Sequence, residues 1–86
     1  MVKVLDFYAN WCYPCKVLSP ILDEIEKELN IDIEKINVED NDEYVEYYDI
    51  KSVPTLILIK DGIVEDRING LVPKEKLVER IKKKIS

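Results

Sequence analysis

The chain has 86 residues, 47% of them hydrophobic and 36% charged, which suits one modest core, so we expect a single domain over residues 1–86. Its net charge of −5 and its lack of histidine argue against a nucleic-acid binder, which needs a concentrated basic face. The longest apolar run, residues 56–59, is too short to span a bilayer, and no secretory signal opens the chain, so we expect a cytoplasmic protein without a membrane partner.

Residues 2–8 (VKVLDFY) are nearly all apolar and rich in strand-forming types, which is typical of a strand covered on both faces. From Lys16 onward apolar residues recur every four positions, which predicts an amphipathic helix that ends near Asn30. The repeating positions are Val17, Ile21, Ile25 and Leu29. Residues 31–38 then predict a second strand.

A short helix is expected after the second strand. Asn41 or Asp42 can cap it, and it should run through about Tyr48. Its aromatic residues, Tyr44, Tyr47 and Tyr48, are expected to pack against the protein with their hydroxyl groups at the surface.

Residues 55–59 predict a third strand, and Asp61-Gly62 is a tight-turn signal that leads into residues 63–68, so these two strands should form an antiparallel hairpin. Pro73 suits the first turn of a final helix. The residues of that helix expected to face inward are Leu77, Val78, Ile81 and Ile85. The order β-α-β-α-β-β-α predicts an α/β fold with a mixed four-stranded sheet and three helices, the first two strands being parallel because a helix joins them.

The two cysteines, Cys12 and Cys15, lie where the first strand ends and the long helix begins. A sulfur at a helix N-terminus faces unpaired backbone N–H groups and the positive end of the helix dipole, and both stabilise the thiolate. Because the thiolate is the nucleophile in disulfide exchange, this placement predicts a redox-active pair. We expect Cys12 to be the exposed attacking thiol and Cys15, one turn further on, the shielded resolving thiol.

Two other uses of the cysteine pair are less consistent with the sequence. A zinc site needs four ligands, and the chain has no third cysteine and no histidine, so a metal or iron–sulfur site would require two chains. A purely structural disulfide would gain little stability from so short a loop. No metal-binding residues are therefore assigned.

The chain resembles the thioredoxin family in a series of short motifs. They are DFYANWCYPCK at residues 6–16, SPILDE at 19–24, KINV at 35–38, VPTL at 53–56, DG at 61–62 and NG at 69–70. The resemblance, which runs from about residue 4 to the C-terminus, implies a thioredoxin-like fold and the reduction of protein disulfides. The chain departs from the family in two ways: the usual first strand and helix are missing, and Tyr13 stands where glycine is usual.

The resemblance also implies roles for two charged residues. Asp6, the lone charge in the apolar stretch 4–9, matches the family's buried aspartate, which accepts the proton of Cys15. Lys35 matches the lysine that lies near this aspartate and tunes its pKa. The expected catalytic residues are therefore Cys12, Cys15, Asp6 and Lys35.

A docking surface for an extended substrate is expected around the cysteines. Pro54 matches a cis-proline packed against the pair, which leaves the backbone of Val53 free to bind substrate, and Gly70 would allow a close backbone approach. The expected substrate-binding residues are Trp11, Tyr13, Pro14, Val53, Pro54 and Gly70.

This chemistry would need no organic cofactor or metal, because the Cys12–Cys15 pair itself carries the electrons. The expected partners of a monomeric chain are disulfide-containing proteins as substrates and a separate reductase as electron donor. The alternatives are a glutathione-dependent, glutaredoxin-like enzyme on the same fold, a non-enzymatic binding module, and a dimeric metal or cluster carrier.

Overall fold

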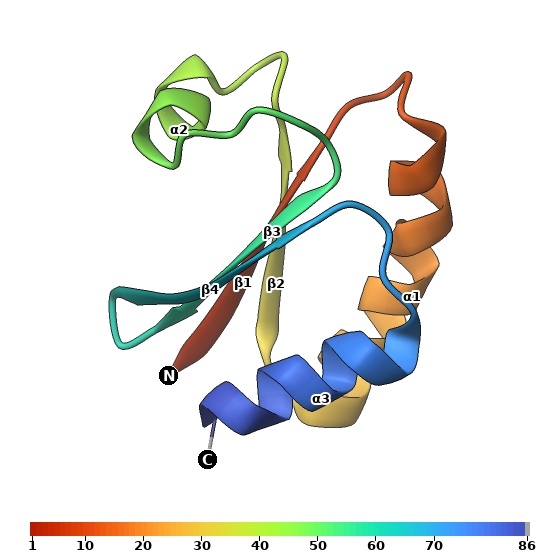
Figure 1. Ribbon diagram of the computed structural model, residues 1–86, viewed down its shortest axis with the longest axis vertical. Helices are drawn as coiled ribbons and strands as arrows, with labels where there is room; N and C mark the ends of the chain where they lie inside the picture. Colours follow the sequence, from red (N-terminus) through yellow and green to blue (C-terminus); the bar gives the residue numbers. More distant parts are fainter. Residues whose placement is uncertain (86) are drawn as a thin grey trace.

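The computed structural model describes residues 1–85, along which seven elements follow one another (Figure 1). They are β1 (Val2–Tyr8), α1 (Tyr13–Leu29), β2 (Asp32–Asn37), α2 (Asp42–Tyr47), β3 (Thr55–Lys60), β4 (Ile63–Asn69) and α3 (Lys74–Ile85). This order confirms the predicted α/β fold class. None of the helices in this part of the chain has the length and apolarity that crossing a membrane requires.

The four strands form one mixed sheet in the order β2-β1-β3-β4. β1 pairs in parallel with β2, and β3 pairs antiparallel with β4, both as predicted. The structure adds the antiparallel pairing of β1 with β3. The β3–β4 hairpin turns at Asp61 and Gly62, whose φ angles of 52° and 83° are the two positive values that a type I′ turn requires. β1 therefore lies inside the sheet, and its C-terminal end leads the chain to the cysteine pair.

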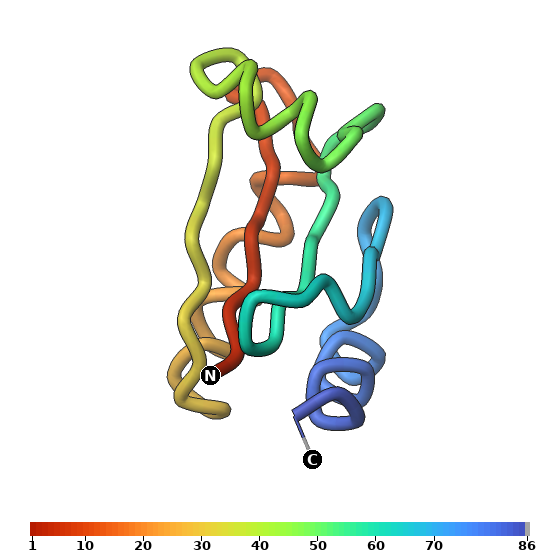
Figure 2. The backbone as a smooth tube through the Cα atoms, turned by 90° about the vertical axis from the view of Figure 1, so that its left-hand side faces the viewer, coloured from red at the N-terminus to blue at the C-terminus, as the bar shows by residue number. Residues whose placement is uncertain are grey.

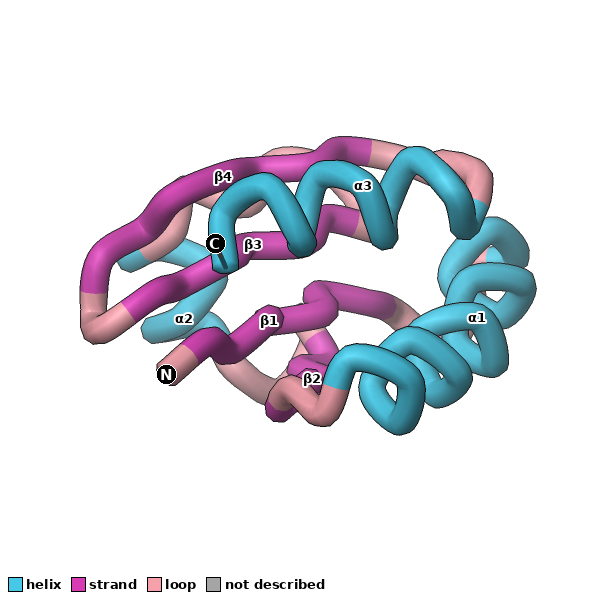
Figure 3. Tube along the Cα trace, turned by 90° about the horizontal axis from the view of Figure 1, so that it is seen from below, coloured by secondary structure: helices cyan, strands magenta, loops and turns pink. Residues whose placement is uncertain are grey.

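Helices cover both faces of the sheet. α1 and α3 pack on one face, over a core made of Val4, Leu18, Leu22, Ile25, Leu56, Leu58, Ile68, Leu77 and Ile81. On the other face Tyr48, just after α2, and Ile50 cover a second cluster made of Leu5, Phe7, Ile36 and Ile57. Figure 3 shows α1 and α2 on opposite sides of β1 and β3, and Figure 2 shows α2 at the end of the sheet where β1 leads into α1.

The ends of α1 agree with the sequence expectation, and the start of α2 differs in one contact. α1 begins at Tyr13, so the cysteine pair lies at its start with Cys15 in its first turn, and it ends as expected at Asn30, which is left-handed with φ 53°. Asn41 stands at the N-cap of α2, but its side chain makes no capping hydrogen bond. Its amide donates instead to the carbonyl of Asn37 at 2.9 Å, so Asn41 holds the predicted N-cap position without the side-chain bond.

Three apolar or aromatic side chains are more exposed than predicted: Ile85, Tyr47 and, at 44% exposed, Tyr44. Ile85 is exposed because α3 reaches the periphery of the sheet there, where the ammonium of Lys60 lies 3.4 Å from the Ile85 carbonyl. Tyr47 is exposed because only one side of the short helix α2 faces the sheet. The ring of Tyr47 lies edge-on against Tyr48, with 4.8 Å between centroids, rather than in the core.

Candidate active site

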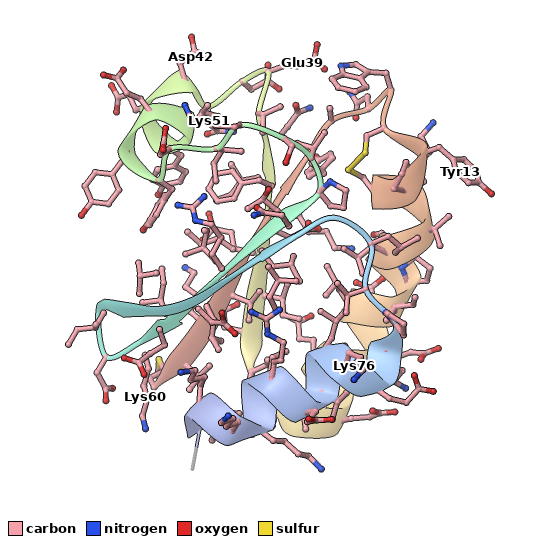
Figure 4. The ribbon with its side chains drawn as sticks, viewed as in Figure 1. Tyr13, Glu39, Asp42, Lys51, Lys60 and Lys76 are labelled. Atoms are coloured by element: carbon pink, nitrogen blue, oxygen red, sulfur yellow. A yellow bond between two sulfur atoms is a disulfide. The ribbon has the colours of Figure 1, made fainter. Side chains whose placement is uncertain are left out.

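The cysteine pair lies at the junction of β1 and α1. The chain turns after β1, with the N–H of Cys12 donating to the Ala9 carbonyl at 3.1 Å, and this places Cys12 at the N-cap of α1. Pro14 occupies the first turn of the helix, where its missing N–H would have had no partner within the helix. Cys12 and Cys15 form a disulfide with Cα atoms 5.3 Å apart, the yellow bond of Figure 4.

The N-cap position gives the Cys12 sulfur its chemical character. The N–H of Cys15 donates to Cys12 Sγ at 3.2 Å, as an N–H of the first turn donates to the oxygen of an ordinary N-cap side chain. In the reduced protein this N–H and the helix dipole both favour the Cys12 thiolate over the thiol. The geometry therefore supports Cys12 as the nucleophile of the pair.

Cys12 is not the exposed partner that the sequence suggested. In the disulfide form Cys12 is 4% exposed and Cys15 is 5% exposed. Both pack with Ala9 in a small cluster that Tyr8, Val38 and Val53 also contact. Because neighbouring side chains cover both cysteines equally, any difference in their reactivity must come from their positions on the helix, Cys12 at the N-cap and Cys15 in the first turn.

Exposed aromatic side chains flank the buried pair. Trp11 is 70% exposed and Tyr13 is 74% exposed, and Pro14 is exposed between them and Cys15. Figure 4 shows Tyr13 pointing away from the molecule beside the start of α1. These three residues form an accessible apolar rim, and their binding of substrate stays a prediction.

The loop before β3 closes the site from the other side. The Val53–Pro54 peptide is cis, as the resemblance implied, and Val53 packs on the cysteine cluster. The Pro54 ring is fully buried, which agrees with a proline packed against the pair, and substrate binding at Pro54 stays a prediction. Its carbonyl accepts the N–H of Gly70 at 2.8 Å, which links the proline to the loop after β4. Gly70 is half-buried, with φ 85°.

Asp6 is the buried carboxylate that the sequence indicated. It lies in the middle of β1 and is 3% exposed, and its Oδ1 has no hydrogen-bond partner. A pocket of about 240 Å³ is lined by both Asp6 and Cys15, so the two groups face a common space. Burial raises the pKa of Asp6 from 3.8 to about 6; the Lys35 charge lowers it and the Asp23 charge raises it, both by less.

Lys35 lines the same pocket but does not pair with Asp6. Its ammonium donates to Ser19 Oγ at 2.6 Å and to Asp23 Oδ1 at 2.8 Å, both on α1. The expected influence of Lys35 on Asp6 is therefore present as an electrostatic effect that lowers the pKa of Asp6.

Sequence reasoning missed three polar residues around the site. Ser19 and Asp23 are four apart on α1, a spacing that puts both on one face of the helix and could have marked them as a pair. Thr55 is buried at the start of β3, and its hydroxyl lies 2.7 Å from the Ser52 carbonyl and 3.1 Å from Asn69 Oδ1. No sequence signal pointed to this contact, because it depends on the loop that precedes β3. Within residues 1–85 no three His, Cys, Asp or Glu side chains cluster as metal ligands.

Known proteins match the chain over most of its length. A sequence model of the thioredoxin family matches residues 1–83. The thioredoxin of Chlamydia caviae is 44% identical over 79 residues, which cover 91% of this chain and 78% of the relative. The thioredoxin of Staphylococcus epidermidis is 42% identical over 84 residues, which cover 95% and 81%.

Solved structures agree in shape. A mutant thioredoxin from Halobacterium salinarum superposes with a TM-score of 0.92 at 33% identity, over 95% of this chain and 73% of that one. Fasciola hepatica thioredoxin gives 0.89 at 35% identity, over 95% and 79%. With the Cys12–Cys15 disulfide at the head of α1, these matches show that the chain belongs to the thioredoxin family and is a thiol–disulfide oxidoreductase, a protein-disulfide reductase acting through that pair.

Proposed function

We propose that this reductase works in the cytoplasm with Cys12 as the attacking thiol and Cys15 as the resolving thiol. The observation that carries these roles is the arrangement along α1. Cys12 occupies the N-cap, where its thiolate is stabilised, and Cys15 lies one turn inside, on the pocket that also holds Asp6.

The reaction balances with the pair as its only electron carrier. The Cys12 thiolate attacks one sulfur of the substrate disulfide, forms a mixed disulfide, and releases the other substrate sulfur as a thiolate. Cys15 then loses its proton and attacks Cys12 Sγ, which closes the Cys12–Cys15 disulfide and releases the second substrate sulfur. The substrate gains two electrons and two protons, and no organic cofactor or metal takes part.

Asp6 is the group that would accept the proton of Cys15. A general base works best when its pKa lies near the working pH, and burial raises the pKa of Asp6 to about 6. At neutral pH the carboxylate is therefore mostly ionised and ready to accept a proton. Its Oδ1 makes no competing hydrogen bond, so it is free to do so across the shared pocket.

Substrate would dock on the exposed rim of Trp11, Tyr13 and Pro14, with the Val53 backbone and Gly70 completing the surface. Both rim aromatics present large apolar area at low entropic cost, which suits the varied surroundings of disulfides in different proteins. A separate reductase would return the pair to the dithiol form, and the chain would act as a monomer.

The first experiment measures the redox midpoint of the pair in defined thiol–disulfide buffers, using the fluorescence of Trp11, the single tryptophan. A strongly reducing midpoint supports the proposed direction of electron flow. A markedly more oxidising one would favour a glutaredoxin-like or isomerase role. Without a reversible transition the proposal fails.

The roles of the two cysteines are tested with single variants and a model protein disulfide such as insulin. Cys12→Ser should abolish exchange, because the attacking sulfur is lost. Cys15→Ser should accumulate a mixed disulfide with the substrate, which non-reducing electrophoresis detects. Equal turnover by the two variants would contradict the assignment.

A further inference from the structure

Two carboxylates, those of Asp6 and Asp23, lie near Lys35, but its ammonium bonds only Asp23. Asp6 and Lys35 are register partners on the parallel strands β1 and β2, so their side chains leave the sheet side by side on the same face. Both line the pocket next to Cys15. The ammonium nevertheless bonds Asp23 and Ser19, while Oδ1 of Asp6 has no hydrogen-bond partner.

The two anchors of Lys35 come from one turn of α1. Ser19 and Asp23 are separated by four residues and therefore lie on one face of the helix, toward β2. Asp23 is largely exposed and well hydrated, whereas Asp6 is buried, so the ammonium reaches Asp23 without giving up its contact with water. These contacts fix the end of a flexible side chain that could otherwise turn into the pocket.

We propose that Asp23, assisted by Ser19, is a positioning residue that holds the Lys35 ammonium away from the Asp6 carboxylate and so leaves this carboxylate free to exchange a proton with Cys15. The inference rests on the proposed role of Asp6 as proton acceptor. A Lys35 ammonium bonded directly to Asp6 would occupy the lone pairs that must receive the proton, and it would stabilise the ionised carboxylate.

Few other charges act on this pocket. Lys16 from α1 and Lys35 from β2 are the cations that line it, and its uncharged polar groups come from Tyr8, Asn10 and Ser19. On β3 the register partner of Asp6 is the apolar Leu56, and within the described residues no charged side chain of α2, β3, β4 or α3 lines the pocket. We therefore expect the position of the Lys35 ammonium to be the main factor that can change the pKa of Asp6.

The test is a double-mutant cycle read on Asp6 itself. The pKa of Asp6 is measured from its carboxyl carbon chemical shift in the oxidised wild type, Asp23→Asn, Lys35→Met and the double variant. Asp23→Asn should lower the pKa of Asp6 by about one pH unit or more, the range that a contacting cation produces, because Lys35 turns toward Asp6. In the Lys35→Met background the same change should have a clearly smaller effect, since only the direct charge of Asp23 is lost.

Equal effects in the two backgrounds would overturn the proposal, because the influence of Asp23 would then not pass through Lys35. Glu24→Gln is the matched control: it removes a carboxylate from the neighbouring position of α1, where Glu24 bonds Lys74 at 2.9 Å, and should leave the pKa of Asp6 within error. Ser19→Ala should lower the pKa of Asp6 less than Asp23→Asn, since it removes a hydrogen bond but no charge.

The cycle also separates this inference from the role of Asp6. Chemical shifts report where Lys35 lies whether or not Asp6 takes part in catalysis. The role of Asp6 is read separately, from the rate at which Cys15 resolves the mixed disulfide in Asp6→Asn. If the cycle shows coupling but Asp6→Asn resolves at the wild-type rate at every pH, Asp23 positions Lys35 but the proposed function of Asp6 fails.

Discussion

Asp6 should make the protein less stable at neutral pH than it would be with a neutral side chain in the same place. Burial raises the pKa of Asp6 from 3.8 to about 6, and each unit corresponds to about 1.4 kcal/mol. Between pH 3.8 and 6 the folded state binds more protons than the unfolded state, so stability falls as the pH rises through this window. Above pH 6 the cost of the ionised carboxylate is about 3 kcal/mol.

The variant Asp6→Asn removes the charge and keeps the shape. We expect it to be more stable than the wild type by about 3 kcal/mol at pH 7.5 and to match the wild type below pH 4, where Asp6 is protonated. The assay is guanidinium unfolding of the oxidised proteins, followed by circular dichroism from pH 3.5 to 8. The exposed carboxylate Asp40 supplies a control, since Asp40→Asn should show no such trend. A gain for Asp6→Asn that does not change with pH would refute the reasoning, because ionisation would not be its cause.

Three further variants test the core, the loop and the rim. Phe7→Ala should destabilise the fold by about 3–5 kcal/mol in denaturant unfolding, because the ring is fully buried, and a loss below about 1 kcal/mol would contradict its place in the core. Gly70→Ala should cost about 1–2 kcal/mol through its φ of 85° alone, since among the residues beyond its chain neighbours no atom lies within 4 Å of the added Cβ; a much larger loss would indicate a clash. Trp11→Ala should raise KM for a protein disulfide while changing stability by less than about 0.5 kcal/mol, and an unchanged KM would remove Trp11 from the docking surface.

The sequence predicted the fold well because its local signals agree with one another. The four-residue apolar repeat before Asn30 marks α1, and Asn30 itself is left-handed at the helix end. The Asp61-Gly62 turn fixes the β3–β4 hairpin, because both residues adopt positive φ. A lone aspartate within an apolar strand predicted the buried carboxylate, and Asp6 is buried.

The details that the sequence could not predict depend on tertiary contacts. The burial of Cys12 comes from neighbours such as Val38 and Val53, which are far away along the chain. Lys35 is an exposed residue on the edge strand β2, and nothing in the sequence of that strand indicates which acid it will bind. The bond from the Asn41 side chain to Asn37 competes with capping, and only the folded turn decides which is made.

The two ends of the described chain lie together, far from the disulfide. Val2 pairs with Lys60, whose ammonium lies 3.4 Å from the Ile85 carbonyl, so the start of β1 and the end of α3 lie at the same end of the molecule, as Figure 1 shows. β1 spans seven residues, about 23 Å, between this end and the turn that leads to Cys12. The protein is therefore suited to immobilisation or fusion: a linker, a solid support or a second protein attached at either terminus would leave the rim of Trp11 and Tyr13 open to incoming disulfides.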